Sequence, residues 1–281
     1  MKKAVKWIFR NGKWSKPIRE LIYHVNPNLI KKSKFIITKV FYCDCCMLVN
    51  TEDSYGIDVV RRGIIETPED EYLKKIINKR DFVLDIGAHW GGFSILFGML
   101  VGKYGRVFSF EPSKKNYRIL KKNIKINKLD DYVIPFNFAV GNEFRLLNFP
   151  LSQTSSGHNS LVRKDIPIIT YEQVQQVKLD DFLNEKKVNK VNFIKIDIEG
   201  YELEALKGLE KTIKNSENLK MLIEYSPSFM GYDKAMELLE FLKQNFQDVF
   251  ICYKKKIFKT TWEDALKISV DTGQRNLFLF K

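Results

Sequence analysis

The 281-residue chain lacks the features that define several protein classes. No stretch approaches the roughly 18 uninterrupted apolar residues of a membrane-spanning helix, which argues against an integral membrane protein. Only four cysteines are present, too few for a disulfide scaffold and suited to a reducing compartment. Lys6 and Arg10 interrupt the apolar residues of the basic start, so no secretory signal peptide is expected. Together these absences predict a cytoplasmic protein.

Internal repeats and low-complexity tracts are also missing, whereas 44% hydrophobic and 13% aromatic residues suffice for a large core. The cysteines are not expected to form a zinc site, because Cys-x-Cys-Cys at residues 43–46 is the wrong spacing and the only other cysteine, Cys252, is remote, so a second pair of ligands at matching spacing is missing. We therefore interpret them as strand or core residues and predict no metal site from them.

Positive charge is concentrated at the N-terminus. Residues 1–40 contain eleven Lys or Arg and one acid, Glu20, and so carry +10 of the net +13. Trp7 and Trp14 interleave with the cations, as in an interfacial amphipathic helix. Three interpretations stay open: a helix whose apolar side packs on the body, peripheral contact with an anionic membrane or other polyanion, and nucleic-acid binding.

The chain divides into a basic amphipathic N-terminal arm (1–33), lead-in strands (34–66) and one α/β domain (67–281). In the domain, strands alternate with helices, two of which are expected at 113–127 and 200–214. The alternation predicts a doubly wound, mostly parallel seven-stranded sheet with helices on both faces. Its strands are expected at 82–88, 106–112, 132–140, 191–198, 220–226, 248–254 and 276–280.

Polar residues follow several of these strands. In doubly wound sheets, ligands bind at the carboxyl ends of the strands, so these residues are the candidates for a site. The acids among them each follow an apolar run, which solvation alone hardly explains. The residues at the strand ends are Asp85 with Gly87, Glu111, Asn137, Asp197 with Glu199, and Glu224.

The first of these strands ends in Asp85-Ile-Gly87-Ala88-His-Trp-Gly91. Gly87 permits a tight turn, and Gly91 would let the backbone approach a ligand before the next helix. The segment matches neither the dinucleotide-binding nor the P-loop pattern. Glu111, twenty residues beyond Gly91, suits both hydroxyls of a ribose. The chain thus has a glycine turn and an acid suited to a ribose, but no phosphate-binding loop. This combination fits an adenosine cofactor without phosphates, such as S-adenosylmethionine (SAM).

Six segments, covering about residues 55–230, resemble the FkbM-type SAM-dependent methyltransferases of the class I Rossmann-like fold in order and spacing. They are VLDIGAHWGGFSIL, VFSFEPSKKNYRILKKNIKIN, AVGN, VKLDDFL, NFIKIDIEGYELEALKGLEKTI and MLIEYSP. The arm lies outside the resemblance, which assigns His89 no chemistry. It implies cofactor binding by Asp85, Gly87, Ala88 and Gly91, by Glu111 at the ribose, and by Asn137 or Phe138 at the adenine.

Methyl transfer requires in-line alignment of acceptor and methyl group, and an alcohol acceptor also needs a base for its proton. Asp197 and Glu199 follow the fourth strand, beside the expected methyl position. One of them could be the base, the pair could bind a divalent metal such as Mg²⁺, or Glu199 could cap the next helix. The metal is one alternative and is not the prediction. His158, in a Ser/Gly/Asn-rich loop at 152–160, is a second candidate base.

The leading hypothesis is O-methylation of a hydroxyl on a glycan or small-molecule acceptor. One alternative is a nucleic-acid methyltransferase that uses the basic arm as a phosphate clamp. The other is a non-catalytic protein that binds SAM and docks on membranes through the arm.

Overall fold

The computed structural model describes residues 34–40, 45–63, 69–153, 155–254 and 256–281. The basic arm, the expected boundary at residue 67 and Cys43 lie outside these residues. Within the described part of the chain, no helix is long and apolar enough to cross a membrane.

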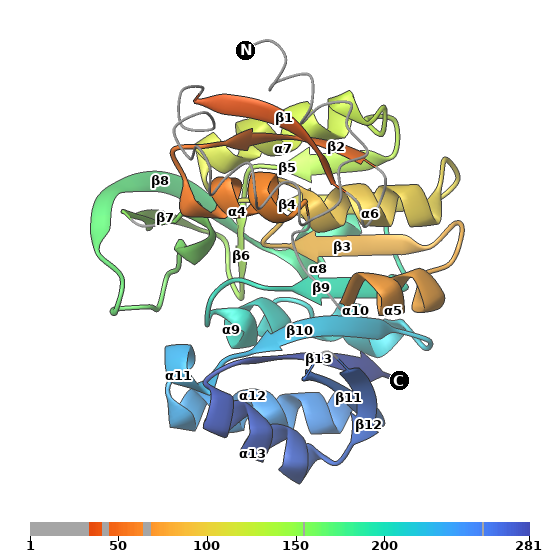
Figure 1. The fold of residues 1–281 in the computed structure, drawn as a ribbon. Coiled ribbons are helices and arrows are strands. Elements are labelled where there is room, and N and C mark those ends of the chain that lie inside the picture. Colours follow the sequence, from red (N-terminus) through yellow and green to blue (C-terminus); the bar gives the residue numbers. More distant parts are fainter. Residues whose placement is uncertain (1–33, 41–44, 64–68, 154, 255) are drawn as a thin grey trace.

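The central sheet has eight strands in the order β12-β11-β13-β10-β9-β3-β4-β5 (Figure 1). Neighbouring strands run parallel from β5 to β10, and β13, β11 and β12 extend the sheet antiparallel. The strands are β3 (Phe82–Ile86), β4 (Arg106–Phe110), β5 (Val133–Phe136), β9 (Phe193–Ile196), β10 (Lys220–Tyr225), β11 (Asp248–Tyr253), β12 (Lys256–Thr260) and β13 (Arg275–Phe280).

The expected count of seven strands was therefore one short. The extra strand is β12, which pairs with β11 as a hairpin at the sheet edge. Its sequence KIFKT has only two apolar residues, between lysines, and no buried residue, so it lacks the continuous apolar run that marked the other strands.

Helices cover both faces of the sheet, which confirms the doubly wound architecture. Alternate strand residues enter two separate cores: Val83 and Val107 pack on one face, Leu84 and Phe108 on the other. The first face carries α5 (Glu69–Ile76), α6 (Gly92–Val101) and α7 (Lys114–Ile126). The second carries α8 (Leu179–Glu185), α9 (Glu202–Lys207), α10 (Glu210–Asn215), α11 (Pro227–Met230), α12 (Tyr232–Asn245) and α13 (Trp262–Thr272).

The lead-in consists of an antiparallel pair, β1 (Phe35–Val40) and β2 (Cys45–Asn50), followed by α4 (Ser54–Arg62). Two asparagines connect β2 to the domain by hydrogen bonds. Asn123, in α7, accepts one from Leu48 N at 2.6 Å, and Asn127, the C-cap of α7, accepts one from Cys46 N at 3.0 Å. Cys46 and Cys252 are free thiols. The expectation of reduced cysteines is wrong for Cys45, which is disulfide-bonded.

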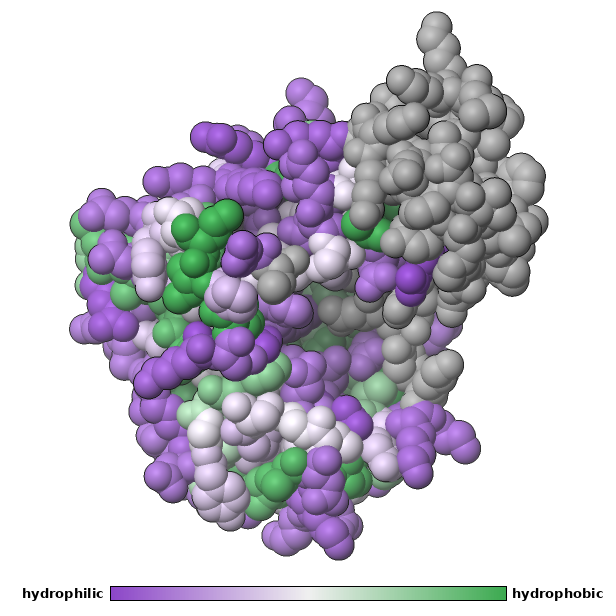
Figure 2. All heavy atoms as spheres, turned by 60° about the vertical axis from the view of Figure 1, so that its left-hand side comes forward, coloured by the Kyte–Doolittle hydropathy of each residue, from purple (hydrophilic) through white to green (hydrophobic). Residues whose placement is uncertain are grey.

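A second, three-stranded sheet in the order β6-β8-β7 projects beside the carboxyl ends of the central strands (Figure 1). It consists of β6 (Ala139–Gly141), β7 (Arg145–Ser152) and β8 (Ile168–Lys178), and the short helix η1 (Ser156–His158) lies in the connection between β7 and β8. A space-filling view from this side shows a hollow between the second sheet and the central domain (Figure 2). The fold therefore places the second sheet against the edge where ligands bind in doubly wound proteins.

Candidate active site

The turn after β3 is fixed by close packing between two strand ends. The main-chain N–H groups of Gly87 and Ala88 both donate to Phe110 O, at 3.0 and 2.9 Å. Gly87 has φ 83°, and a Cβ there would lie 1.9 Å from Asp197 O. Glycine is required because the turn must adopt a positive φ and contact the backbone after β9.

Gly91 makes a close packing contact with α7, and the expectation that its backbone approaches a ligand stays a prediction. It is the N-cap of α6 with φ 88°, and a Cβ there would lie 2.5 Å from Leu120 Cδ1 on α7. It lines neither of the two cavities described below.

We expect Gly91→Ala to lower the free energy of unfolding. The backbone strain of an alanine at φ 88° contributes about 1–3 kcal/mol, and its Cβ would also meet Leu120 Cδ1 at 2.5 Å. Denaturant unfolding measures the loss in the wild type and in a Leu120→Ala background, where the clashing side chain is absent and the loss should shrink to the backbone strain. Equal losses in the two backgrounds would show that α7 accommodates the added methyl group without cost.

Asp85 is fully buried at the end of β3. Its Oδ2 accepts a hydrogen bond from Ser94 Oγ of α6 at 2.6 Å, while Oδ1 has no hydrogen-bond partner among the described residues. Burial raises the pKa of this carboxyl, and the positive charge of Lys195 acts against the increase. A buried acceptor without a partner is costly, so Asp85 Oδ1 is suited to a donor supplied by a ligand.

Glu111 connects the turn to the second strand end. Its carboxylate accepts hydrogen bonds from His89 N at 2.8 Å and Ser113 N at 2.9 Å. Burial raises its pKa to about 7. It lines a cavity. Oε2 accepts from His89 N and has a further lone pair available, while Oε1 accepts from Ser113 N and also has the longer, weaker contact with Asn116 Nδ2 at 3.4 Å.

Two neighbouring residues had been candidates for the adenine side. Phe138 lines the same cavity as Glu111. Asn137 does not line it and instead donates from Nδ2 to Glu111 O and Pro112 O, both at 2.8 Å. Phe138 therefore lies at the cavity, whereas Asn137 supports the loop that carries Glu111; contact of either residue with adenine stays a prediction.

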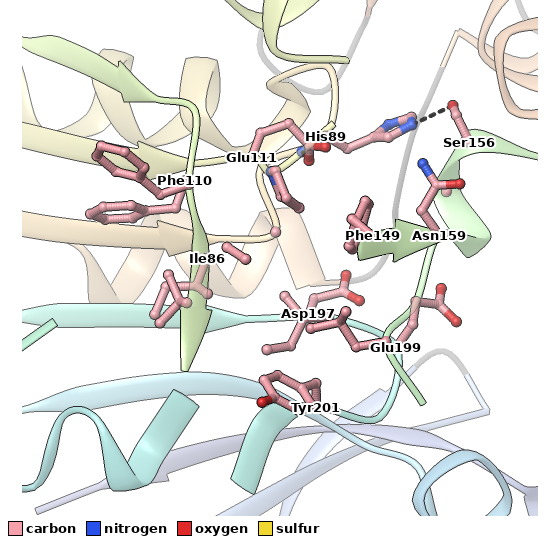
Figure 3. A pocket seen from close by; sticks show the side chains of 18 residues that line it. Ile86, His89, Phe110, Glu111, Phe149, Ser156, Asn159, Asp197, Glu199 and Tyr201 are labelled. Atoms are coloured by element: carbon pink, nitrogen blue, oxygen red, sulfur yellow. Dashed lines mark hydrogen bonds between the residues drawn. The ribbon is translucent and has the colours of Figure 1, made fainter. Parts of the chain in front are cut away.

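Two adjoining cavities open at this edge of the sheet, and Figure 3 shows the first from close by. The apolar cavity is lined by side chains that include Ile86, Phe110, Phe138, Val140 and Phe149, together with Glu111. The polar cavity is lined by residues that include Asp85, Ala88, Phe93, His158 and Lys195. Both cavities share Gly87, His89, Gly157, Asp197 and Glu199.

The shared wall carries the acidic pair that follows β9. Lys195 Nζ lies 3.0 Å from Asp197 Oδ2, and Arg163 Nη1 lies 2.6 Å from Glu199 Oε2. Lys195 and Arg163 are only 4% and 11% exposed, so both ion pairs are shielded from solvent. In Figure 3, Asp197 and Glu199 lie across the apolar cavity from Glu111. The structure thus brings the two predicted catalytic acids to one site.

Glu199 does not cap the next helix, so that interpretation is wrong. Its φ is 57°, and α9 begins only at Glu202. Glu202 takes the supporting role, because its Oε1 accepts from Ile198 N at 3.0 Å and from Gly200 N at 3.2 Å. Burial raises the pKa of Glu199 and of Glu202 to about 7 in each case.

The buried Glu202 should make the folded protein less stable as pH rises. Between its ordinary pKa near 4.5 and about 7, the unfolded state has lost the proton that the folded state keeps, so the free energy of unfolding falls across this window. Glu202→Gln keeps the acceptor oxygen and does not ionise. We expect it to raise the free energy of unfolding at about pH 8 by about 1–3 kcal/mol and by less at about pH 5.5. Denaturant titrations at both pH values test this, and a gain independent of pH would contradict it.

The two histidines of the site differ in their surroundings. His158, in η1, lines the polar cavity with Asp197 and Glu199, and burial lowers its pKa. His89 has φ 50°, and its Nε2 lies 2.7 Å from Ser156 Oγ (Figure 3). Burial lowers the pKa of His89 to about 4, so its ring is neutral and links the turn after β3 to η1.

Sequence reasoning missed Arg163 and Ser156. Both lie in the connection between β7 and β8. Ser156 belongs to the predicted Ser/Gly/Asn-rich loop, in which only His158 was named as a candidate. Nothing local indicated that this connection would fold back to the acids after β9.

A family model for the methyltransferase FkbM domain matches residues 85–248, which is more than half of the chain. The chain belongs to this family. Membership confirms the class I methyltransferase fold and SAM as the cofactor, both of which the sequence motifs had implied.

Curated relatives in the family are distant. The hexuronic acid methyltransferase AglP of Haloferax volcanii is 23% identical over 158 residues, covering 56% of this chain and 58% of that protein. Methyltransferase 1 of Beauveria bassiana is 26% identical over 149 residues, covering 46% of this chain and 58% of that protein. The chain thus spans less than two thirds of the length of either relative. Among solved structures, the O-methyltransferase of Bacillus cereus in complex with SAH is 14% identical, with a TM-score of 0.45 and coverage of 75% and 78% of the two chains.

Proposed function

We propose that this protein transfers the methyl group of SAM to a hydroxyl oxygen of a glycan or small-molecule acceptor. The observation that carries the proposal is the order of the two cavities. An apolar cavity with Glu111 adjoins a polar cavity with Asp85 and Lys195, and Asp197 and Glu199 stand at the junction. This order matches an adenosine at one end of the cofactor, an amino acid at the other and the methyl-bearing sulfur between them.

The residues present fit the cofactor at both ends. Glu111 has acceptor oxygens available for the two ribose hydroxyls, beside the apolar walls that would hold the adenine. Asp85 Oδ1, which is buried and lacks a hydrogen-bond partner among the described residues, can accept from the ammonium of the methionine part. The hydrogen bond would offset the cost of burying this oxygen.

At the junction, the chain's own groups would position the acceptor and take its proton. Bound SAM supplies a methyl group on a positively charged sulfur, and the sulfur is a good leaving group when the methyl group is transferred. Asp197, fixed by Lys195 at 3.0 Å, is placed to accept the hydroxyl proton as the oxygen attacks. Glu199, with a pKa raised to about 7, can exchange a proton near neutral pH. The neutral ring of His89 and the side chain of Ser156 form the wall on the side of η1.

A sugar acceptor is supported by one relative of the chain, a hexuronic acid methyltransferase. The two alternative hypotheses, a nucleic-acid clamp and membrane docking, depend on the arm, which lies outside the described residues. Both therefore remain predictions that no observation favours.

The test of the proposal is methyl transfer from radiolabelled SAM to a panel of acceptors. The panel contains uronic-acid and neutral glycans, hydroxylated small molecules, RNA and DNA. We expect label on a sugar or small-molecule oxygen and none on nucleic acid. Label on RNA or DNA would support the clamp hypothesis instead, and SAM binding without transfer to any class would support the non-catalytic one.

A further inference from the structure

Three carboxylates converge at the junction of the two cavities. One oxygen from each of Asp197, Glu199 and Glu224 lies within 4.8 Å of the others. The cluster is built by the central sheet, because β9 and β10 pair in parallel with Ile196 beside Ile223. The residues that directly follow this pair, Asp197 and Glu224, are therefore neighbours, and the turn at Glu199 returns the third carboxylate to them.

Glu224 has the most unusual environment of the three. Asp197 is paired with Lys195 and Glu199 with Arg163, but Glu224 Oε2 is buried with no hydrogen-bond partner among the described residues. The side chain is only 7% exposed. A buried carboxylate beside two other carboxylates requires a positive partner or a proton.

The geometry suits a hard divalent cation. Oxygen ligands on opposite sides of a bound ion are roughly 4–5 Å apart, since Mg²⁺–O distances are about 2.0–2.1 Å and Ca²⁺–O distances about 2.3–2.6 Å. The three oxygens lie within this reach of one another. Lys195 and Arg163 each contact one carboxylate oxygen, and each carboxylate has a second oxygen available for a metal.

We propose that Asp197, Glu199 and Glu224 form a binding site for a divalent cation of the Mg²⁺ or Mn²⁺ type at the junction of the two cavities. Glu224 is the ligand behind the cavity wall, while Asp197 and Glu199 face the cavities. The role of the site rests on the proposed function: a cation here contacts the acceptor oxygen and lowers the pKa of its hydroxyl. The site also accounts for three acidic side chains at one point of a largely apolar wall.

The test is Mn²⁺ binding to the purified full-length chain at about pH 7.5, followed by electron paramagnetic resonance without SAM. We expect saturable binding by the wild type and an affinity lower by about 10–100-fold or more in Glu224→Gln. Removing the buried charge should leave this variant folded, which circular dichroism verifies; if it is unfolded, Glu224→Asp replaces it. Mn²⁺ should also raise the melting temperature of the wild type and not that of Glu224→Gln.

Glu202→Gln is the matched control, because Glu202 is a buried carboxyl that acts on Glu224 only through its charge. We expect it to change Mn²⁺ affinity far less than Glu224→Gln does. A wild type that binds no Mn²⁺ at millimolar concentration, or equal effects of the two variants, would overturn the inference. Calorimetry with SAM on the same preparation separates the claims: SAM binding without Mn²⁺ binding refutes the cation site alone, whereas absence of SAM binding refutes the proposed function.

Discussion

Replacing Glu111 with Gln should weaken SAM binding by about 100-fold or more. In the proposed binding mode the carboxylate accepts hydrogen bonds from both ribose hydroxyls, and each hydrogen bond to a charged group contributes about 1.5–3 kcal/mol. The amide keeps one acceptor oxygen and turns the other into a donor that faces His89 N, which now donates to Glu111 at 2.8 Å. Isothermal titration calorimetry with SAM measures the change.

The effect should also depend on pH, which separates ligand contact from a general loss of structure. Because the pKa of Glu111 is raised to about 7, protonation below this value removes an acceptor, so SAM affinity of the wild type should fall as pH decreases through 7. Glu111→Gln should lose that part of the pH dependence. Glu172→Gln is the matched control, since Glu172 likewise accepts from a main-chain N–H, that of Lys114 at 2.9 Å, but lines neither cavity. Equal affinities of both variants would refute the ribose role.

Replacing Asp197 with Asn should reduce kcat by about 10²–10⁴-fold, the usual contribution of a general base. Asparagine preserves the shape of the side chain but cannot take up the acceptor proton. SAM affinity should change much less, because the adenosine and methionine ends of the cavities are intact. Single-turnover methyl transfer to the acceptor found in the panel measures the rate, with calorimetry for SAM in parallel.

Asp181→Asn, on the exposed face of α8, is the control for the chemical change and should leave the rate unaltered. Loss of Asp197 also leaves the buried Lys195 without its 3.0 Å partner, so the folded fraction of the variant is measured first. If folded Asp197→Asn turns over within a few-fold of the wild type, the proton acceptor is another group, and Glu199 and His158 are the remaining candidates in the polar cavity.

The parts of the fold that were predictable are those where burial dictates the sequence. Strands covered on both faces are nearly continuous apolar runs, and this made FVLDI and FIKI recognisable as β3 and β9. The β7–β8 hairpin was missed because much of it faces solvent: Leu146 is 71% and Ile169 66% exposed. The apolar residues of β7 and β8 therefore do not follow the pattern that a buried core imposes, and the length of the two strands could not be predicted from the local sequence.

The same distinction applies to the candidate site. Residues at strand ends, such as Asp85 and Glu111, were predictable because position along the strand fixes position in the sheet. For Gly91 the sequence indicates a position without a side chain but does not say which group lies beside it; in the structure Leu120 is one such group. Arg163 was not predictable, since its contact with Glu199 spans 36 residues of chain and depends on how the second sheet folds back.

The central claim is that one cofactor bridges the two cavities, with its ribose on Glu111 and its ammonium on Asp85. A crystal structure of the full-length protein soaked with SAM tests it most directly. The account predicts adenine against Phe138, ribose hydroxyls within hydrogen-bond distance of Glu111, and the methyl group directed at Asp197 and Glu199. Density for SAM elsewhere, or a Glu111 carboxylate that stays bonded only to main-chain N–H groups while the ligand binds, would contradict it.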